Sequence, residues 1–291
     1  MSAIRSMTAF ARREARGPEG ALVWELRSVN HRYLDISARL PEELRVLEPA
    51  VRERVAARLR RGKVDCALRF QPEAAVAAAV SLDRGQAERV AVLARQAAAL
   101  LGGAAAPASP FELLRWPGVV REEPADLGPV RSRALALLEE ALDELEATRA
   151  REGARIEALL RERIAAMRPL VARARALRPQ VIEAALARWR ERLAELGGEP
   201  DPGRLEQELA IQAQRLDVAE ELDRLEAHLA EVEAALGREE PVGRRLDFLM
   251  QELNREANTL AAKSADAETT RIAVELKVLI EQMREQVQNV E

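Results

Sequence analysis

One stretch near the C-terminus, residues 243–264, gathers side chains that could bind a cation or a polyanion. It has the sequence GRRLDFLMQELNREANTLAAKS. Most of the chain is built from Ala, Leu, Arg and Glu, and of its 45 basic residues only Lys63, Lys263 and Lys277 are lysines. A GC-rich genome explains such a bias, so the positions that resist it are candidates for specific chemistry. Residues 243–264 hold one of these lysines and two asparagines, and so indicate such a site.

Helical spacing divides this stretch into three stripes. The apolar stripe, predicted to be buried, contains Leu246, Leu249, Met250, Leu253, Ala257 and Leu260. A polar stripe follows at steps of four, three and four and contains Asp247, Gln251, Asn254 and Asn258. The third contains Glu252, Glu256 and Thr259. A helix with two polar stripes is expected to contact partners on more than one side.

The third stripe is the predicted metal site. Carboxylates four residues apart on a helix can converge on one cation, so Glu252 and Glu256 are predicted metal ligands and catalytic residues. Asn254, Arg255 and Asn258 suit contacts to sugar and phosphate, and Lys263 is predicted to bind RNA with them. The alternative is that both polar stripes form hydrogen bonds to neighbouring helices.

A second constellation lies just upstream, on a predicted helix over residues 217–229. Asp217, Glu221, Arg224 and His228 are spaced four, three and four apart, so they share one face. Two carboxylates and an imidazole suit Mn²⁺, which accepts oxygen and nitrogen ligands. Asp217, Glu221 and His228 are therefore further predicted metal ligands, and His228 is also a predicted catalytic residue. The alternative is surface ion pairing of the two carboxylates with Arg224.

The N-terminal part of the chain is predicted to bind RNA. Residues 1–72 hold 15 basic against 9 acidic residues, a balance of +6, whereas residues 203–291 hold 11 against 20, a balance of −9. A basic module is typical of polyanion binding. The set predicted to hold RNA backbone and stack a base is Arg27, Asn30, His31, Arg32, Tyr33 and Lys63. Tyr33 could equally be a core residue.

Composition describes a soluble globular protein. The chain has 291 residues, of which 48% are hydrophobic and 32% charged, enough for two domains that each bury a core. It has no run of 18 apolar residues and no signal-peptide pattern, so we expect a cytoplasmic protein without a membrane partner. The single cysteine, Cys66, lies in an apolar run and is predicted to be a small buried side chain.

The order of elements predicts an α+β fold. Strands are expected at residues 4–15, 21–40 (with a bulge near Asn30), 64–70 and about 75–82, and helices at 41–59 and from 83 to 101. An antiparallel sheet with helices on one face would form an N-terminal domain over 1–103, followed by a Pro-rich connector over 104–129. The remainder is helical: residues 130–202 are predicted to form an assembly arm, either a hairpin or a coiled coil with kinks at Pro169 or Pro179. Residues 203–291 would form an acidic C-terminal helical domain with the catalytic site.

Several strings carry a resemblance to a known family. These strings are SMTAFARRE, RSVNHRYLDISARLP, RGKVD, DVAEELDRLEAHL, GRRLDFLMQELNREANTLAAKS and ELKVLIEQMREQVQNVE. Together they resemble the YicC/YloC family of bacterial endoribonucleases. The resemblance covers both ends of the chain in order, while residues 75–200 contribute little. It implies a metal-dependent endonuclease, with Mn²⁺ or Mg²⁺ as cofactor, that cuts single-stranded regions of RNA. It also implies a homo-oligomer, a hexamer, that encloses an RNA-binding space.

Two chemical routes and one rival class of protein are consistent with these residues. In the favoured route, carboxylate-held cations activate water for phosphodiester hydrolysis while arginines steady the substrate. In the second, the 2′-hydroxyl of the RNA attacks, with His228 or His31 as general base. The rival is a non-catalytic RNA-binding or assembly protein, whose polar stripes hold copies together. A further prediction is that the end of the last helix, at Glu291, is docked inside the assembly; the alternative is a solvated tail.

Overall fold

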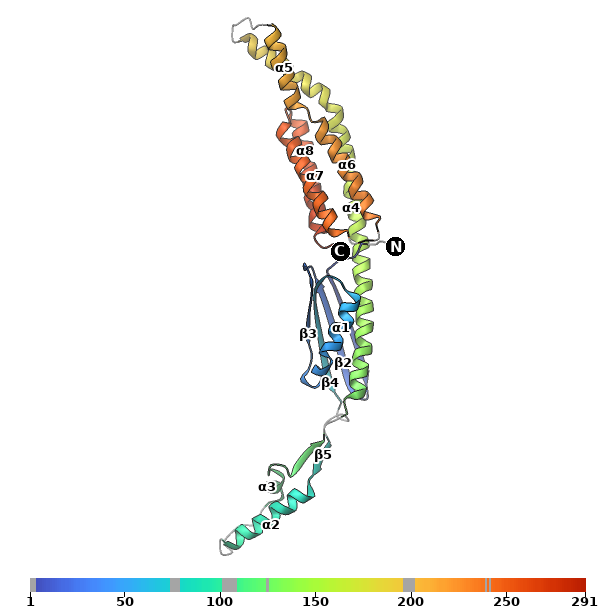
Figure 1. Cartoon of the computed structure of the whole chain (residues 1–291), viewed down its shortest axis with the longest axis vertical. Helices are drawn as coiled ribbons and strands as arrows, with labels where there is room; N and C mark the ends of the chain where they lie inside the picture. The colour runs from blue at the N-terminus through green and yellow to red at the C-terminus, as the bar shows by residue number, and fades with distance from the viewer. Residues whose placement is uncertain are drawn as a thin grey trace.

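The computed structural model describes residues 4–73, 79–100, 109–123, 126–195, 202–238, 240 and 242–291. The molecule is elongated, and the helix α4 (Gly128–Glu195, 68 residues) forms its spine (Figure 1). A four-stranded sheet lies along the first part of α4, and three helices pack along its second part. The predicted α+β class, an N-terminal sheet followed by a long helix and C-terminal helices, is confirmed.

The sheet is mixed. Its strands are β1 (Ala9–Gly17), β2 (Gly20–Val29), β3 (Leu34–Arg39) and β4 (Gly62–Pro72). They lie in the order β1-β2-β4-β3, with antiparallel pairing throughout except that β3 runs parallel to β4. The tight turn between β1 and β2 depends on Gly20, whose φ of 123° is unfavourable for other residues.

The single long strand predicted over residues 21–40 is wrong. The chain leaves the sheet after Val29, turns at residues 30–33, and re-enters as β3 on the far side of β4. Residues 30–32 (Asn-His-Arg) offer no apolar side chain to the core, so alternation stops there and the strand ends. Residues 30–33 are called the β2–β3 turn below.

One face of the sheet is covered by helices. The 3-10 helix η1 (Glu42–Leu47) leads into α1 (Glu48–Arg58), which lies beside the first part of α4. The inward residues of β2, including Leu22, Trp24 and Leu26, pack against them, and the indole nitrogen of Trp24 donates to the carbonyl of Ala134 at 2.8 Å. Cys66 is buried in the same core, as predicted; burial raises the pKa of its thiol to about 12, so it is chemically inert.

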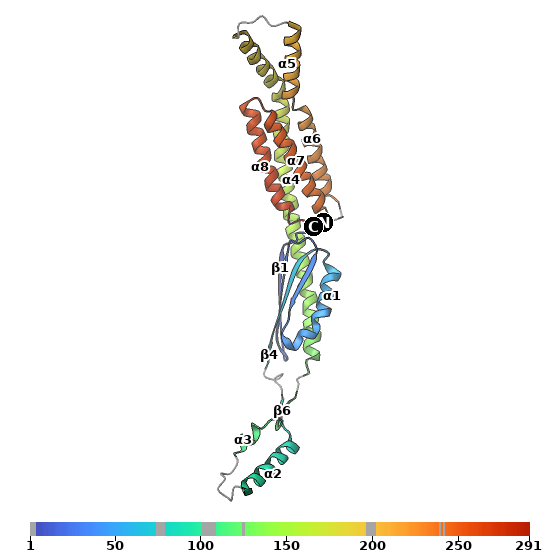
Figure 2. The same cartoon turned by 60° about the vertical axis from the view of Figure 1, so that its left-hand side comes forward.

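A small unit extends beyond the sheet. It contains β5 (Ala79–Leu82), α2 (Arg84–Leu100), α3 (Pro110–Leu114) and β6 (Val120–Glu123). Figures 1 and 2 place it at the end of the molecule opposite α5. The strand β6 comes from the predicted connector and pairs with β5, which comes from the predicted N-terminal domain. The domain boundaries at 103, 129 and 202 stay predictions.

The C-terminal helices form a second core with α4. These are α6 (Ala219–Leu236), α7 (Gly243–Lys263) and α8 (Ala267–Val287), while α5 (Pro202–Leu216) packs against α4. Helix α4 continues through both Pro169 and Pro179 instead of folding into the predicted hairpin. Its apolar stripe therefore serves two cores, with Leu138 in the first and Leu160 in the second. None of the described helices is long and apolar enough to cross a membrane.

The chain ends meet at the middle of α4 (Figure 1). Ser6 forms a β-bridge with Val290, and the backbone N–H of Glu291 donates to the carbonyl of Arg5 at 2.9 Å. We call residues 4–7, 149–153 and 288–291 the junction. The chain passes so close to Gly153 that a Cβ there would lie 1.9 Å from the carbonyl oxygen of Ile4. Glu291 is docked on its own chain, so the alternative of a solvated tail is excluded, while docking inside an assembly stays a prediction.

Candidate metal centre and RNA-binding residues

Helix α7 presents its apolar stripe inward, as predicted. All six residues of that stripe are buried: Leu246, Leu249, Met250, Leu253, Ala257 and Leu260. They pack against α6 and α8. This packing fixes the rotation of α7 about its axis, and therefore decides where each polar stripe points.

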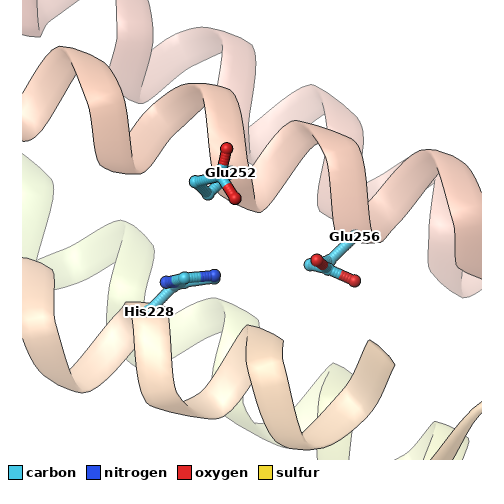
Figure 3. Close-up of side chains that lie close together, drawn as sticks. All are labelled: His228, Glu252 and Glu256. Carbon is cyan, nitrogen blue, oxygen red and sulfur yellow. The ribbon is translucent and has the colours of Figure 1, made fainter. Parts of the chain in front are cut away.

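Two residues of α7 and one of α6 form the candidate metal centre. Ligand atoms of His228, Glu252 and Glu256 all lie within 4.8 Å of one another. Figure 3 shows Glu252 and Glu256 pointing from α7 toward His228 on the facing helix. Glu256 is buried, with 4% of its surface exposed, while His228 and Glu252 are partly buried. We call these three residues the His-Glu-Glu cluster.

Neighbouring core residues hold this cluster in place. On α7 the buried Leu253 and Ala257 each follow one of the two glutamates, and on α6 the buried Leu225 and Leu229 flank His228. Since α6 and α7 pack directly on each other, side chains at the edge of their contact must converge. The cluster lies at that edge, partly accessible from outside.

An arginine lies beside the cluster. The guanidinium of Arg224, one turn before His228 on α6, is 3.5 Å from the Glu256 carboxylate and 2.5 Å from that of Glu220. A carboxylate as deeply buried as Glu256 requires a counter-charge. Arg224 supplies it here, and its half-exposed side chain could also turn toward an anion.

The donor set fits a divalent cation of intermediate character. Ligands in neighbouring positions of an octahedral ion lie about 3 Å apart, and opposite ones about 4.2 Å, given metal–ligand distances of about 2.1 Å. The ligand atoms of the three side chains lie within 4.8 Å of one another, close to this range. Two carboxylates with one imidazole suit Mn²⁺ better than Mg²⁺, which prefers oxygen ligands and water.

The structure does not bring Asp217 and Glu221 into this cluster. Asp217 precedes α6, binds Arg178 at 2.7 Å and accepts the backbone N–H of Ala219 at 2.9 Å. Burial alone would raise its pKa, but the hydrogen bonds from Ala219 and Arg178 outweigh burial and lower the pKa. The buried Glu221 pairs with Lys263 at 2.7 Å. The predicted stripe of residues 217–228 is therefore divided between ion pairs and the cluster.

The remaining predicted residues of α7 bind one another on its surface. Gln251 donates to Asp247 at 3.0 Å, and Asn258 donates to Asn254 at 3.3 Å. Lys263, also predicted to contact RNA, donates to Glu221 and to the carbonyl of Asp217. Asn254 is partly buried, and Arg255 and Asn258 are exposed. These three are accessible to an RNA, whereas Lys263 is already committed to an ion pair.

The N-terminal residues that are predicted to bind RNA lie at one end of the sheet. In the β2–β3 turn, Asn30 donates to the carbonyl of Gln288 at 2.7 Å, and His31 Nδ1 lies 3.0 Å from the carbonyl of Tyr33. The Arg32 guanidinium lies over the ring of Tyr33, 5.2 Å from its centroid. Tyr33 is 62% exposed, which excludes the alternative that it belongs to the core.

Comparison with known proteins shows two matches that together cover most of the chain. The family model described as "Endoribonuclease YicC-like, N-terminal region" matches residues 4–158, and the one described as "Endoribonuclease YicC-like, C-terminal" matches residues 174–291. The chain belongs to the YicC-like endoribonuclease family. The family resemblance carried by the sequence strings is thereby confirmed.

Two curated relatives of this YicC-like chain share its full length. A Haemophilus influenzae protein named "Probable endoribonuclease YicC" is 42% identical over 288 residues, which cover 99% of this chain and all of the relative. A Clostridioides difficile protein of the same name is 30% identical over 293 residues, covering 98% of this chain and 99% of the relative.

Two features of the YicC-like chain were not predicted from its sequence. Arg149 is a buried arginine of the junction, and Phe10 is an exposed aromatic residue on the sheet. The sequence holds a signal for Arg149, because an isolated glycine within a helical pattern often has a packing reason, and Gly153 lies one turn from Arg149. For Phe10, alternation along β1 between the buried Ala9 and Ala11 was the available signal.

Proposed function

We propose that this chain is an endoribonuclease that cleaves single-stranded regions of RNA by metal-dependent phosphodiester hydrolysis. The observation that carries the proposal is the convergence of His228, Glu252 and Glu256 at the contact between α6 and α7. Membership of the YicC-like family, and the names of the two full-length relatives, support endonuclease activity on RNA. The cofactor in this proposal is Mn²⁺ or Mg²⁺, of which the donor set favours Mn²⁺.

Each member of the cluster has a distinct part in the proposal. Glu256, buried and fixed by packing, would anchor the cation, while the partly exposed Glu252 and His228 would complete its protein ligands and face the substrate. A divalent ion bound there would supply Lewis-acid stabilisation of phosphate charge and a more acidic water. Arg224 now neutralises Glu256. If a cation took over that role, the Arg224 guanidinium would be free to hold a phosphate oxygen by a charge-assisted hydrogen bond.

The decisive experiment substitutes the two glutamates. We expect Glu252→Gln and Glu256→Gln to lower the cleavage rate by at least about 100-fold, the usual effect of losing a group that stabilises transition-state charge. RNA affinity and oligomer mass should stay at wild-type values. Glu275→Gln, an exposed carboxylate on α8, is the matched control and should cleave normally. Cleavage that persists in both variants while the oligomer dissociates would instead assign the stripes to assembly.

Chelation and product analysis separate the two chemical routes. Hydrolysis predicts that EDTA abolishes cleavage, that Mn²⁺ restores it, and that no 2′,3′-cyclic phosphate forms. Attack by the 2′-hydroxyl predicts cyclic phosphate and activity that survives EDTA. Of the two histidines named for that route, only His228 lies in the cluster; His31 lies in the β2–β3 turn.

The proposal includes RNA as partner and self-assembly, with a hexamer as the expected state. Light scattering of the purified chain, with and without RNA, measures the mass directly. A monomer under all conditions would remove assembly from the proposal without affecting the cluster chemistry.

A further inference from the structure

The sheet has a second face that no described element covers. We call this the open face. Figures 1 and 2 show α1 and α4 on the same side of the sheet, and strand side chains alternate between that covered side and the open face. Strand register places Phe10 opposite Arg27, Arg27 opposite Asp65, and Asp65 beside Ser37. An aromatic ring and a cation are therefore cross-strand neighbours on this surface.

Phe10 is an unusual residue to leave in water. It is 55% exposed, although its neighbours in β1, Ala9 and Ala11, are buried. Aromatic residues make up only 3% of the chain. Exposed rings on a sheet surface are typical of proteins that bind single-stranded nucleic acid, because every base has a face on which a ring can stack.

The charges around Phe10 leave positive charge uncompensated. Glu25 is paired with Arg12 at 3.8 Å and with Arg69 at 3.4 Å, and Asp65 is paired with Arg39 at 3.8 Å. Within the described residues, neither Arg27 nor Lys63 has a hydrogen bond or ion pair from its side chain; Asp35 is the register neighbour of Lys63 but is not ion-paired with it. A polyanion would provide the missing partner for Arg27.

The surface is also hollowed. A shallow depression of about 630 Å³ is lined by Phe10, Arg27, Asp65, Ala67 and Arg69 among others. The small side chain of Ala67 lies between the longer residues Glu25 and Arg39 in its row of the sheet. A planar group that stacks on Phe10 can therefore lie over the centre of the sheet without displacing a large side chain.

We propose that the open face binds single-stranded RNA, with a base stacked on Phe10 and a phosphate held by Arg27. This inference takes its ligand class from the proposed function and adds a binding surface remote from the His-Glu-Glu cluster. A second copy of the chain fits less well. In a two-fold contact centred on this patch, the unpaired Arg27 side chains of both copies would be brought together.

Binding measurements without metal test this proposal independently of cleavage. A fluorescein-labelled single-stranded 12-nucleotide RNA is titrated with the full chain in EDTA, and affinity is read from anisotropy. We expect Phe10→Ala to weaken binding about 5- to 150-fold, the range for losing one base-stacking ring. Phe10→Trp should bind within about twofold of wild type because it keeps a ring. Val46→Ala, which removes an exposed apolar side chain from η1, is the matched control and should not change affinity.

An abasic RNA of the same length identifies stacking as the cause. Wild type should bind it more weakly than normal RNA, and Phe10→Ala should cause no further loss. Unchanged affinity of Phe10→Ala for normal RNA overturns the proposal. So does a change in oligomer mass with Phe10→Ala, which would make the open face an interface between copies. Wild-type chain that binds RNA in EDTA but never cleaves it with Mn²⁺ would contradict the proposed function and leave this inference intact.

Discussion

At the scale of single residues, the chemistry depends on which polar groups are already satisfied. Asp217 and Glu221 resemble metal ligands by type and spacing, yet each holds a cation of the chain itself, Arg178 and Lys263 respectively. Within the described residues, His228, Glu252 and Glu256 are the group of potential ligands that converges. Glu256 retains Arg224 as its counter-charge, a contact that a metal ion can replace.

The Asp217 ion pair predicts a dependence of stability on pH. Its carboxyl has a pKa below its usual range, so the carboxylate form stabilises the fold above pH about 4, and this contribution is lost as pH falls through the lowered pKa. We expect Asp217→Asn to lower the free energy of unfolding at pH 7 by less than about 1 kcal/mol, because the pair is partly exposed.

Urea unfolding at pH 7 and pH 3 measures this effect. The difference between wild type and Asp217→Asn should shrink at the lower pH. A difference of the same size at both values would show that the carboxylate charge is not what stabilises the start of α6.

At the scale of elements, the fold separates a basic sheet from an acidic helical bundle. The β2–β3 turn and β2 carry Arg32 and Arg27, while α6 and α7 carry the carboxylates of the cluster. Such a division allows one element to attract the RNA backbone and another to hold a cation. Packing of α7 on α6 and α8 keeps the second element rigid.

If the basic sheet contacts RNA phosphates, RNA affinity should depend on salt concentration in a specific way. Each phosphate contact contributes about −0.7 to the slope of log affinity against log salt for a single strand. Replacing Arg27 and Arg32 with Gln should weaken binding and flatten this slope by up to about 1.4. Arg155→Gln, an exposed arginine of α4, is the control. An unchanged slope for the double variant would exclude the sheet end as a phosphate-contacting element.

At the scale of the whole molecule, the junction ties both ends of the chain to the middle of α4. Arg149 is 1% exposed, donates from Nε to the carbonyl of Ser6 at 2.8 Å, and forms an ion pair with Glu291. Burial lowers the pKa of Arg149, and Glu291 opposes that shift. One side chain thus connects the segment before β1, the spine, and the segment after α8.

Breaking this buried pair should destabilise the protein strongly. We expect Arg149→Met to cost about 3–5 kcal/mol, because it leaves the Glu291 carboxylate and the Ser6 carbonyl without their partner. Adding Glu291→Gln to it should recover part of the loss. Arg155→Met, on the exposed surface of the same helix, should change the free energy of unfolding by less than about 0.5 kcal/mol. Chemical denaturation of wild type and the three variants measures these free energies of unfolding. A near-neutral effect of Arg149→Met would mean that the junction contributes little to stability.

Local patterns predicted much of this architecture, and long-range packing accounts for the rest. The apolar stripe of α7 follows from helical spacing alone, and type and spacing nominated Glu252, Glu256 and His228, which the structure brings together. Spacing also nominated Asp217 and Glu221, because a shared helix face does not reveal which neighbouring element supplies Arg178 or Lys263. The crossing of the chain from β2 to β3 was not predicted, because β3 pairs in parallel with β4, whose residues are distant in sequence.

Helix α4 contributes residues to both hydrophobic cores, so the stability of one core is linked to that of the other. Val130, Leu138 and Leu145 complete the core under the sheet, whereas Leu160 and Met167 complete the core of the C-terminal helices. If either core melted alone, half of one continuous helix would expose its apolar stripe while the other half remained packed. We therefore expect unfolding to be cooperative: the sheet and the bundle should be lost together, and a ligand that stabilises one should also protect the other.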